Sequence, residues 1–279
     1  TGCTPPPHDV PPPHKDSPLE AQQGPTDGKL NAAQWDINGN IICEPYLRAS
    51  PASIPFDDHL RAVVKELAQK YDVDGIHLDH IRYAGSASSC DPVSEERYGA
   101  PCDDTTEYAD WQRQQIDGTV EKLYTDLSAL DREIWLSAAV WPVYQDNFGW
   151  GVKGGFDTYY QDSKAWLAGQ YIDSISPMIY TGSPNCSGPY FWTRERWSAL
   201  VADFQNDNAG RYVIPGIGVD FCTDDDFAEI TARIEEARRL GTAGHAIFSY
   251  SGLKDRGFFE KLANGPYAQP ASVPPLPWH

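Results

Sequence analysis

The residues of this chain best suited to chemistry lie in one short segment, residues 72–83, which reads DVDGIHLDHIRY. Side chains alternate along a strand, so a predicted strand over 73–79 carries His77 and Asp79 on the same face. In parallel α/β proteins, catalytic groups are placed at the carboxyl ends of strands. Asp79 ends this strand and is therefore the first candidate for a catalytic carboxylate.

One reaction that such a carboxylate could serve is the cleavage of a glycosidic bond, which usually needs a second carboxyl group. One carboxyl protonates the leaving oxygen, and the other acts as a nucleophile or activates water. Asp220 follows a predicted strand over 211–219 and is expected at the same end as Asp79. Asp146 and Glu44 compete with Asp220 for this role. The sequence leaves the identity of the second carboxylate open.

Several polar and aromatic side chains near the predicted strand ends could bind a sugar. Aromatic rings offer apolar faces on which sugar rings stack, although most aromatic side chains serve core packing. Each of three aromatic candidates ends a predicted strand, and a fourth is a candidate for the rim of the site. The predicted substrate-binding residues are His77, His80, Arg82, Tyr83, Trp141, Tyr180, Trp192 and Tyr250.

Two alternatives to a glycosidase come from the same residues. His77, Asp79 and His80 could bind a divalent ion for phosphodiester hydrolysis. Against this, His80 points away from the other two side chains if the strand continues. A barrel that lacks one carboxylate could instead bind glycans without cleaving them. We therefore predict no metal ion or other cofactor.

Net charge limits the partners of the chain. Forty acidic residues against 22 basic ones give a net charge of −18. Such a surface repels the phosphates of nucleic acids, so binding to DNA or RNA is not expected. No stretch of sequence is long and apolar enough to predict a transmembrane segment. The expected partner is a polysaccharide or an oligosaccharide.

Six scattered cysteines, none in a zinc-binding spacing, indicate disulfide bonds and an exported protein. Cys90 and Cys102 bracket one loop and are the most credible pair. Cys186 with Cys222 would join two loops at strand ends, and Cys3 with Cys43 is left by elimination; other connectivities stay open. The predicted location is secreted or in the cell envelope.

Hydrophobic periodicity divides the chain into three parts. Residues 1–28 are rich in proline and read as an arm or a long loop. Residues 29–265 alternate between helical and strand patterns, and residues 266–279 form a proline-rich tail. Predicted strands cover 73–79, 134–141, 171–180, 211–219 and 243–251. Predicted helices cover 56–71, 105–130, 162–169, 193–204 and 223–241, with a last one near 254–263.

Repeated βα alternation implies a parallel sheet with right-handed crossovers. A closed (β/α)₈ TIM barrel needs eight such units, and this chain supplies about five. The expected fold is therefore α/β, of the (β/α)₈ type, with an N-terminal segment elsewhere completing the barrel. A five-stranded doubly wound sheet is the alternative.

Three blocks of the sequence together resemble the glycosyl-hydrolase-like family 10. They are YDVDGIHLDHIRY, IWLSAAVWPVY and DTYYQDSKAWLAGQYIDSISPMIY, within a resemblance that spans roughly residues 30–265. Members of that family are extracytoplasmic bacterial proteins with a (β/α)₈ barrel that act on glycans. Its strand-4 motif, DGIHFDDYFYP, matches Asp79 but has a second aspartate where this chain has His80. The aromatic residue that follows in the motif is Ile81 here.

The resemblance also implies roles for particular residues. Asp162 matches the family's aspartate before a Trp-Leu helix and becomes a third catalytic candidate, although it also fits a helix N-cap. The family's first three strands would precede residue 1. We therefore predict an O-glycosyl hydrolase that acts on a bacterial or extracellular polysaccharide, with a peptidoglycan-type glycan among the candidates.

Overall fold

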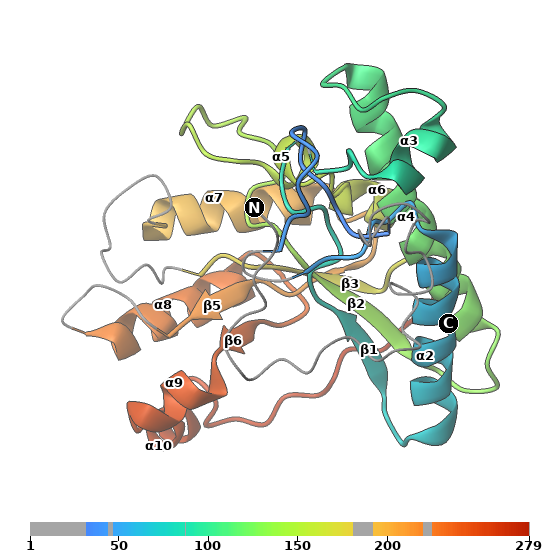
Figure 1. Cartoon of the computed structure of the whole chain (residues 1–279). Coiled ribbons are helices and arrows are strands. Elements are labelled where there is room, and N and C mark those ends of the chain that lie inside the picture. The colour runs from blue at the N-terminus through green and yellow to red at the C-terminus, as the bar shows by residue number, and fades with distance from the viewer. Residues whose placement is uncertain (1–31, 44–46, 87, 181–191, 220–224, 279) are drawn as a thin grey trace. The chain divides into compact units, whose positions relative to one another are not determined.

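The computed structural model describes residues 32–278, apart from 44–46, 87, 181–191 and 220–224 (Figure 1). The chain divides into two compact units. The first contains the described residues up to Val73, His80–Arg132 and Phe156–Asp162. The second contains Asp74–Asp79, Glu133–Gly155 and the described residues from Ser163 onward.

The strands belong to the second unit and pair in parallel. β1 (Gly75–Leu78), β2 (Trp135–Val140), β3 (Ser174–Pro177) and β4 (Tyr212–Val213) form a sheet in that order, and Figure 1 shows β1 to β3 side by side. β5 (Gly216–Gly218) pairs with β6 (Ala246–Phe248). Neighbours in space are thus neighbours in sequence. A barrel has this order, whereas a doubly wound sheet reverses direction at a switch point.

The strand predicted over 211–219 is two strands in the structure. β4 ends at Val213 and β5 begins at Gly216, with Pro215 between them. Proline has no backbone N–H to donate to a ladder, so it interrupts pairing at this point.

Among its described residues, the second unit also contains α6 (Ser163–Ala168), α7 (Arg194–Asn206), α8 (Asp226–Arg239), α9 (Tyr250–Asp255) and α10 (Phe259–Asn264). The N-cap of α7 is Thr193, whose side chain accepts a hydrogen bond from the backbone N–H of Arg196. α7 packs against β4, and α8 packs against β5. Their apolar faces build the core of this unit around Trp197, Leu200, Ile217, Ile230 and Ile234.

β6 ends earlier in the chain than the strand predicted over 243–251. β6 stops at Phe248, and the hydroxyl of Ser249 accepts a hydrogen bond from the N–H of Gly252. This N-cap starts α9, so Tyr250 lies in a helix. Serine is a preferred N-cap residue, and this local signal was overlooked in the strand prediction.

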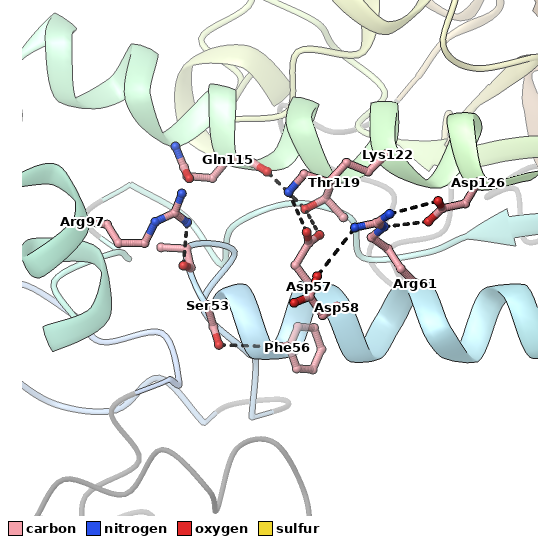
Figure 2. A network of polar contacts seen from close by, with 11 residues as sticks. Ser53, Phe56, Asp57, Asp58, Arg61, Arg97, Gln115, Thr119, Lys122 and Asp126 are labelled. Carbon is pink, nitrogen blue, oxygen red and sulfur yellow. Dashed lines mark hydrogen bonds and ion pairs between the residues drawn. The ribbon is translucent and has the colours of Figure 1, made fainter.

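In the first unit, α2 (Ile54–Lys70) packs against α4 (Thr106–Ser128) through polar contacts, which Figure 2 shows. Asp57, which is 6% exposed, accepts hydrogen bonds from Thr119 Oγ1 and Lys122 Nζ, each at 2.7 Å. One helical turn further along, Arg61 donates two hydrogen bonds to the carboxylate of Asp126. Ion pairs therefore fix the register of the two helices.

The segment between Cys90 and Cys102, which the sequence predicted as a loop, contains a helix. This helix is α3 (Pro92–Tyr98), which begins at the N-cap Asp91 and ends at Gly99 in the left-handed region. Asp before Pro and a later Gly are the usual start and stop of a helix. The predicted disulfide Cys90–Cys102 is confirmed and brackets this helix. Cys43 is also disulfide-bonded, while Cys3, Cys186 and Cys222 lie outside the described residues.

The C-terminal segment packs back onto the second unit at the amino ends of its strands. Trp278 Nε1 donates a hydrogen bond of 2.6 Å to Asp173, which directly precedes β3 and is fully buried. The same carboxylate accepts the backbone N–H of Leu136 on β2 and faces the guanidinium of Arg211. Arg211 lies over the Trp278 ring, 4.4 Å from its centroid. One buried aspartate thus joins two strands and the chain end.

No helix in the described ranges is long and apolar enough to cross a lipid bilayer. Short α5 (Gly155–Thr158), which the sequence did not predict, completes the set of elements drawn in Figure 1.

Candidate active site

Asp79 is exposed and directly follows β1 in the second unit. β1 runs parallel to β2, with His77 opposite Ser137. The close approach of the two strands requires Gly75, because a Cβ there would lie 2.8 Å from the Cβ of Trp135. The glycine of the DGIH motif thus serves strand packing, and the strand that it permits carries His77 and Asp79 toward its carboxyl end.

The charge of Asp79 acts on two neighbouring side chains of the same unit. Desolvation lowers the pKa of His77, and the negative charge of Asp79 partly offsets this effect. Burial raises the pKa of Tyr180, and the charge of Asp79 raises it further. These three predicted site residues therefore form one electrostatic cluster at the carboxyl ends of β1 and β3.

An aromatic pair extends this cluster. Tyr180 stacks on Phe248, with ring centroids 4.7 Å apart and planes 15° from parallel. Phe248 ends β6 and is 60% exposed. Room for Tyr180 depends on Gly216, because a Cβ at that position would lie 2.6 Å from the Tyr180 ring. Sequence reasoning missed Phe248, although it shares a face with the chosen Tyr250 in the strand predicted there.

Trp141 directly follows β2 and is half-buried. Its indole Nε1 donates a hydrogen bond of 2.9 Å to the backbone oxygen of Lys153. Part of its ring packs against the apolar core of the second unit. Trp141 thus anchors the loop after β2 and keeps part of its surface in contact with solvent.

Asp146 lies in the same loop and has a structural role. Its carboxylate accepts hydrogen bonds from the backbone N–H groups of Trp150, Gly151 and Val152. These bonds lower the pKa of Asp146. A carboxylate held in the ionised form by backbone donors is a poor general acid. Asp146 is therefore a weaker candidate for the second catalytic carboxylate than the sequence indicated.

The other predicted acids fall elsewhere. Asp220 and Glu44 lie outside the described residues. Asp162 belongs to the first unit, half-buried, and directly precedes the first residue of α6. His80 and Arg82 also belong to the first unit, where an Arg82 side-chain nitrogen lies 3.3 Å from His80 Nδ1.

Two predicted substrate-binding residues are buried, and these predictions are wrong. Tyr83 has no exposed surface and packs edge-to-face against Tyr160 at 5.6 Å. Trp192, predicted at the rim, is 1% exposed and belongs to the core of the second unit. A fully enclosed ring cannot stack on a sugar. Tyr250 is 71% exposed, but it lies on α9 instead of ending a strand.

The alternative metal site finds no support in the part of the chain that the structure describes. Within those ranges, no group of three or more His, Cys, Asp or Glu side chains is placed to hold a metal ion. His80 itself adopts a left-handed backbone conformation with φ of 53°, so the extended strand does not continue past Asp79.

Comparison with known proteins finds a matching family model and similar proteins. The sequence model of the family described as Glycosyl hydrolase-like 10 matches residues 39–206. Glycosyl hydrolase YngK of Bacillus subtilis is 26% identical over 233 residues, which are 77% of this chain and 44% of YngK. Glycosyl hydrolase DigH of Escherichia coli O6:H1 is 25% identical over 52% of this chain and 34% of DigH. The chain thus spans less than half the length of these relatives.

A solved structure shows the same fold. The PgaB (BpsB) glycoside hydrolase domain from Bordetella bronchiseptica superposes with a TM-score of 0.56 at 17% identity, over 77% of this chain and 63% of that one. Together with the parallel strands in sequential order, this likeness confirms the predicted α/β fold with parallel strands.

Proposed function

Because this chain belongs to the glycosyl hydrolase-like 10 family, we propose that it is a glycoside hydrolase in which Asp79 is a catalytic carboxylate. One observation carries the proposal: exposed Asp79 ends a parallel strand, and its charge acts on both His77 and Tyr180. The carboxyl end of a strand is where barrel enzymes place their catalytic groups. A carboxylate in this position can approach a bound glycan.

In this mechanism, Asp79 attacks the anomeric carbon or activates the water that does so, and a second carboxylic acid protonates the leaving oxygen. Asp220 is the first candidate for the second group, because it follows the strand that ends in β5. A separation of about 5–5.5 Å between the two carboxyl groups would give retention, and about 6.5–9.5 Å inversion.

The proposed substrate is a bacterial or extracellular polysaccharide, with a peptidoglycan-type glycan as the first to be tested. The exposed ring of Phe248, stacked on Tyr180 beside Asp79, supports a sugar as ligand, because aromatic faces bind the apolar faces of pyranose rings. The Cys90–Cys102 disulfide supports a secreted or envelope location, because such bonds persist in oxidising compartments.

The test is the release of new reducing ends from purified bacterial cell-wall glycan. The wild-type chain should produce them, and Asp79→Asn should lower the rate by about 10²-fold or more. Asp104→Asn, which changes an exposed aspartate of the first unit, is the matched control and should keep full activity. Circular dichroism checks that each variant is folded.

Other outcomes would replace the proposal. Full activity in Asp79→Asn would remove Asp79 from the mechanism. Binding of the glycan without any new reducing ends would make the chain a glycan-binding barrel. Loss of activity on treatment with a chelator would instead favour the metal-dependent alternative.

A further inference from the structure

The imidazole of His77 is held by a side chain of the neighbouring strand. Its Nδ1 lies 2.8 Å from the hydroxyl of Ser137, the residue directly opposite in the β1–β2 register. The Ser137 hydroxyl also donates to the backbone oxygen of Ile76 at 3.3 Å. A serine hydroxyl has one proton to donate. Both contacts can therefore be made together only if His77 Nδ1 carries a proton and donates it to Ser137.

A neutral imidazole has one N–H donor and one acceptor nitrogen. With the proton on Nδ1, the Nε2 of His77 carries a lone pair. Desolvation lowers the pKa of His77 from its ordinary value, an effect that exceeds the opposing influence of Asp79, so the ring is neutral at neutral pH. The side chain is exposed on the strand that leads to Asp79. The acceptor nitrogen is thus available to a ligand there.

We infer that His77 is a substrate-binding residue whose Nε2 accepts a hydrogen bond from a hydroxyl of the sugar ring bound beside Asp79. The inference rests on the proposed function and names the chemistry of one subsite. An ionised carboxylate is also an acceptor, so His77 and Asp79 together favour a ligand that donates hydrogen bonds. A neutral ring bearing hydroxyl groups fits this pair better than one bearing a carboxylate or sulfate group at the same position.

The position of the proton can be tested without any substrate. Nitrogen NMR of the full chain with labelled histidine distinguishes a protonated ring nitrogen from an unprotonated one, and His77→Asn identifies the His77 signals by their loss. We expect the proton on Nδ1 near neutral pH. Ser137→Ala should release this constraint and give a mixture of the two tautomers. A proton on Nε2 in the wild-type chain, or an unchanged pattern in Ser137→Ala, overturns the inference.

The ligand contact is tested with cell-wall glycan. His77→Asn keeps an amide within reach of Ser137 but has no counterpart of Nε2. It should raise KM about tenfold, the effect of one lost hydrogen bond, with a smaller change in kcat. His59→Asn, on the exposed face of α2, is the matched control and should leave KM unchanged.

An unchanged KM in His77→Asn would show that Nε2 does not contact the glycan. If the wild-type chain binds the glycan without cleaving it, the same comparison is made on the Kd from titration. A chain that neither cleaves nor binds cell-wall glycan overturns the proposed function and the contact, whereas the NMR result separately decides the tautomer of His77.

Discussion

Phe248, the last residue of β6, stacks on Tyr180, which lies three residues after β3, with ring centroids 4.7 Å apart. Burial and the charge of Asp79 both raise the pKa of Tyr180, so the tyrosine stays neutral and its ring supports the exposed Phe248 face beside the carboxylate. An aromatic ring that is already stacked on another ring loses little conformational freedom when a sugar binds to its exposed face. This pair therefore gives the candidate site a fixed apolar wall.

Removing that wall should weaken substrate binding more than catalysis. Phe248→Ala should raise KM for cell-wall glycan about tenfold, because a lost ring contact is worth about 1–2 kcal/mol. The kcat should change less, since Phe248 carries no group that transfers a proton. Phe259→Ala, another exposed ring of the second unit, is the control. Equal effects of the two substitutions would argue against a sugar platform at Phe248.

The C-terminal contact should contribute to stability. Trp278→Ala removes a hydrogen bond to buried Asp173 and the ring beneath the Arg211 guanidinium. We expect the free energy of unfolding to fall by about 3 kcal/mol. Chemical denaturation measures this change. Val273→Ala, at an 81% exposed position of the same segment, should cost less than about 0.5 kcal/mol. A loss at Trp278 as small as that at Val273 would mean that the segment adds no stability.

Burial should decide the value of the ion pairs between α2 and α4. Asp57→Ala removes a buried carboxylate and leaves the side chains of Thr119 and Lys122 without their acceptor. The free energy of unfolding should fall by about 2–3 kcal/mol. Glu66→Ala breaks an exposed pair with Lys70 and should cost less than about 0.5 kcal/mol. Thermal or chemical denaturation of both variants gives the comparison. Similar values for the two would contradict a structural role for Asp57.

Asp91 should make stability depend on pH in the direction opposite to most carboxylates. Desolvation raises its pKa from 3.8 to about 6, against the opposing hydrogen bonds from Ser94. The folded chain then binds the proton more tightly than the unfolded chain. This contribution to the free energy of unfolding is therefore largest below about pH 4, and it is lost as pH rises through about 6.

The measurement is the free energy of unfolding of the wild type and of Asp91→Asn between about pH 4 and 7. The amide that this substitution introduces does not titrate in this range. Relative to the variant, the wild type should lose about 2 kcal/mol as pH rises across the window. A constant difference between the two proteins would show that Asp91 does not titrate there.

Local patterns in the sequence predicted the parallel α/β fold, the strand that leads to Asp79 and the Cys90–Cys102 pair. Each of these depends on residues that are close in the chain: alternation along a strand, helical periodicity, and two cysteines that bracket one short segment. Capping signals of the same local kind, Asp91-Pro92 and Gly99, also marked α3 but were overlooked.

Only the tertiary structure decided which distant residues meet. The facing of His77 and Ser137 depends on the register of β1 and β2, and the stacking of Phe248 on Tyr180 depends on where β6 stops. The burial of Tyr83 and Trp192 likewise depends on what packs around them. Aromatic residues occur in the same sequence patterns in a core and in a binding site, so the pattern alone does not reveal burial. The sequence determined that Asp79 ends a strand. The packing of residues far apart in the chain determined its neighbours.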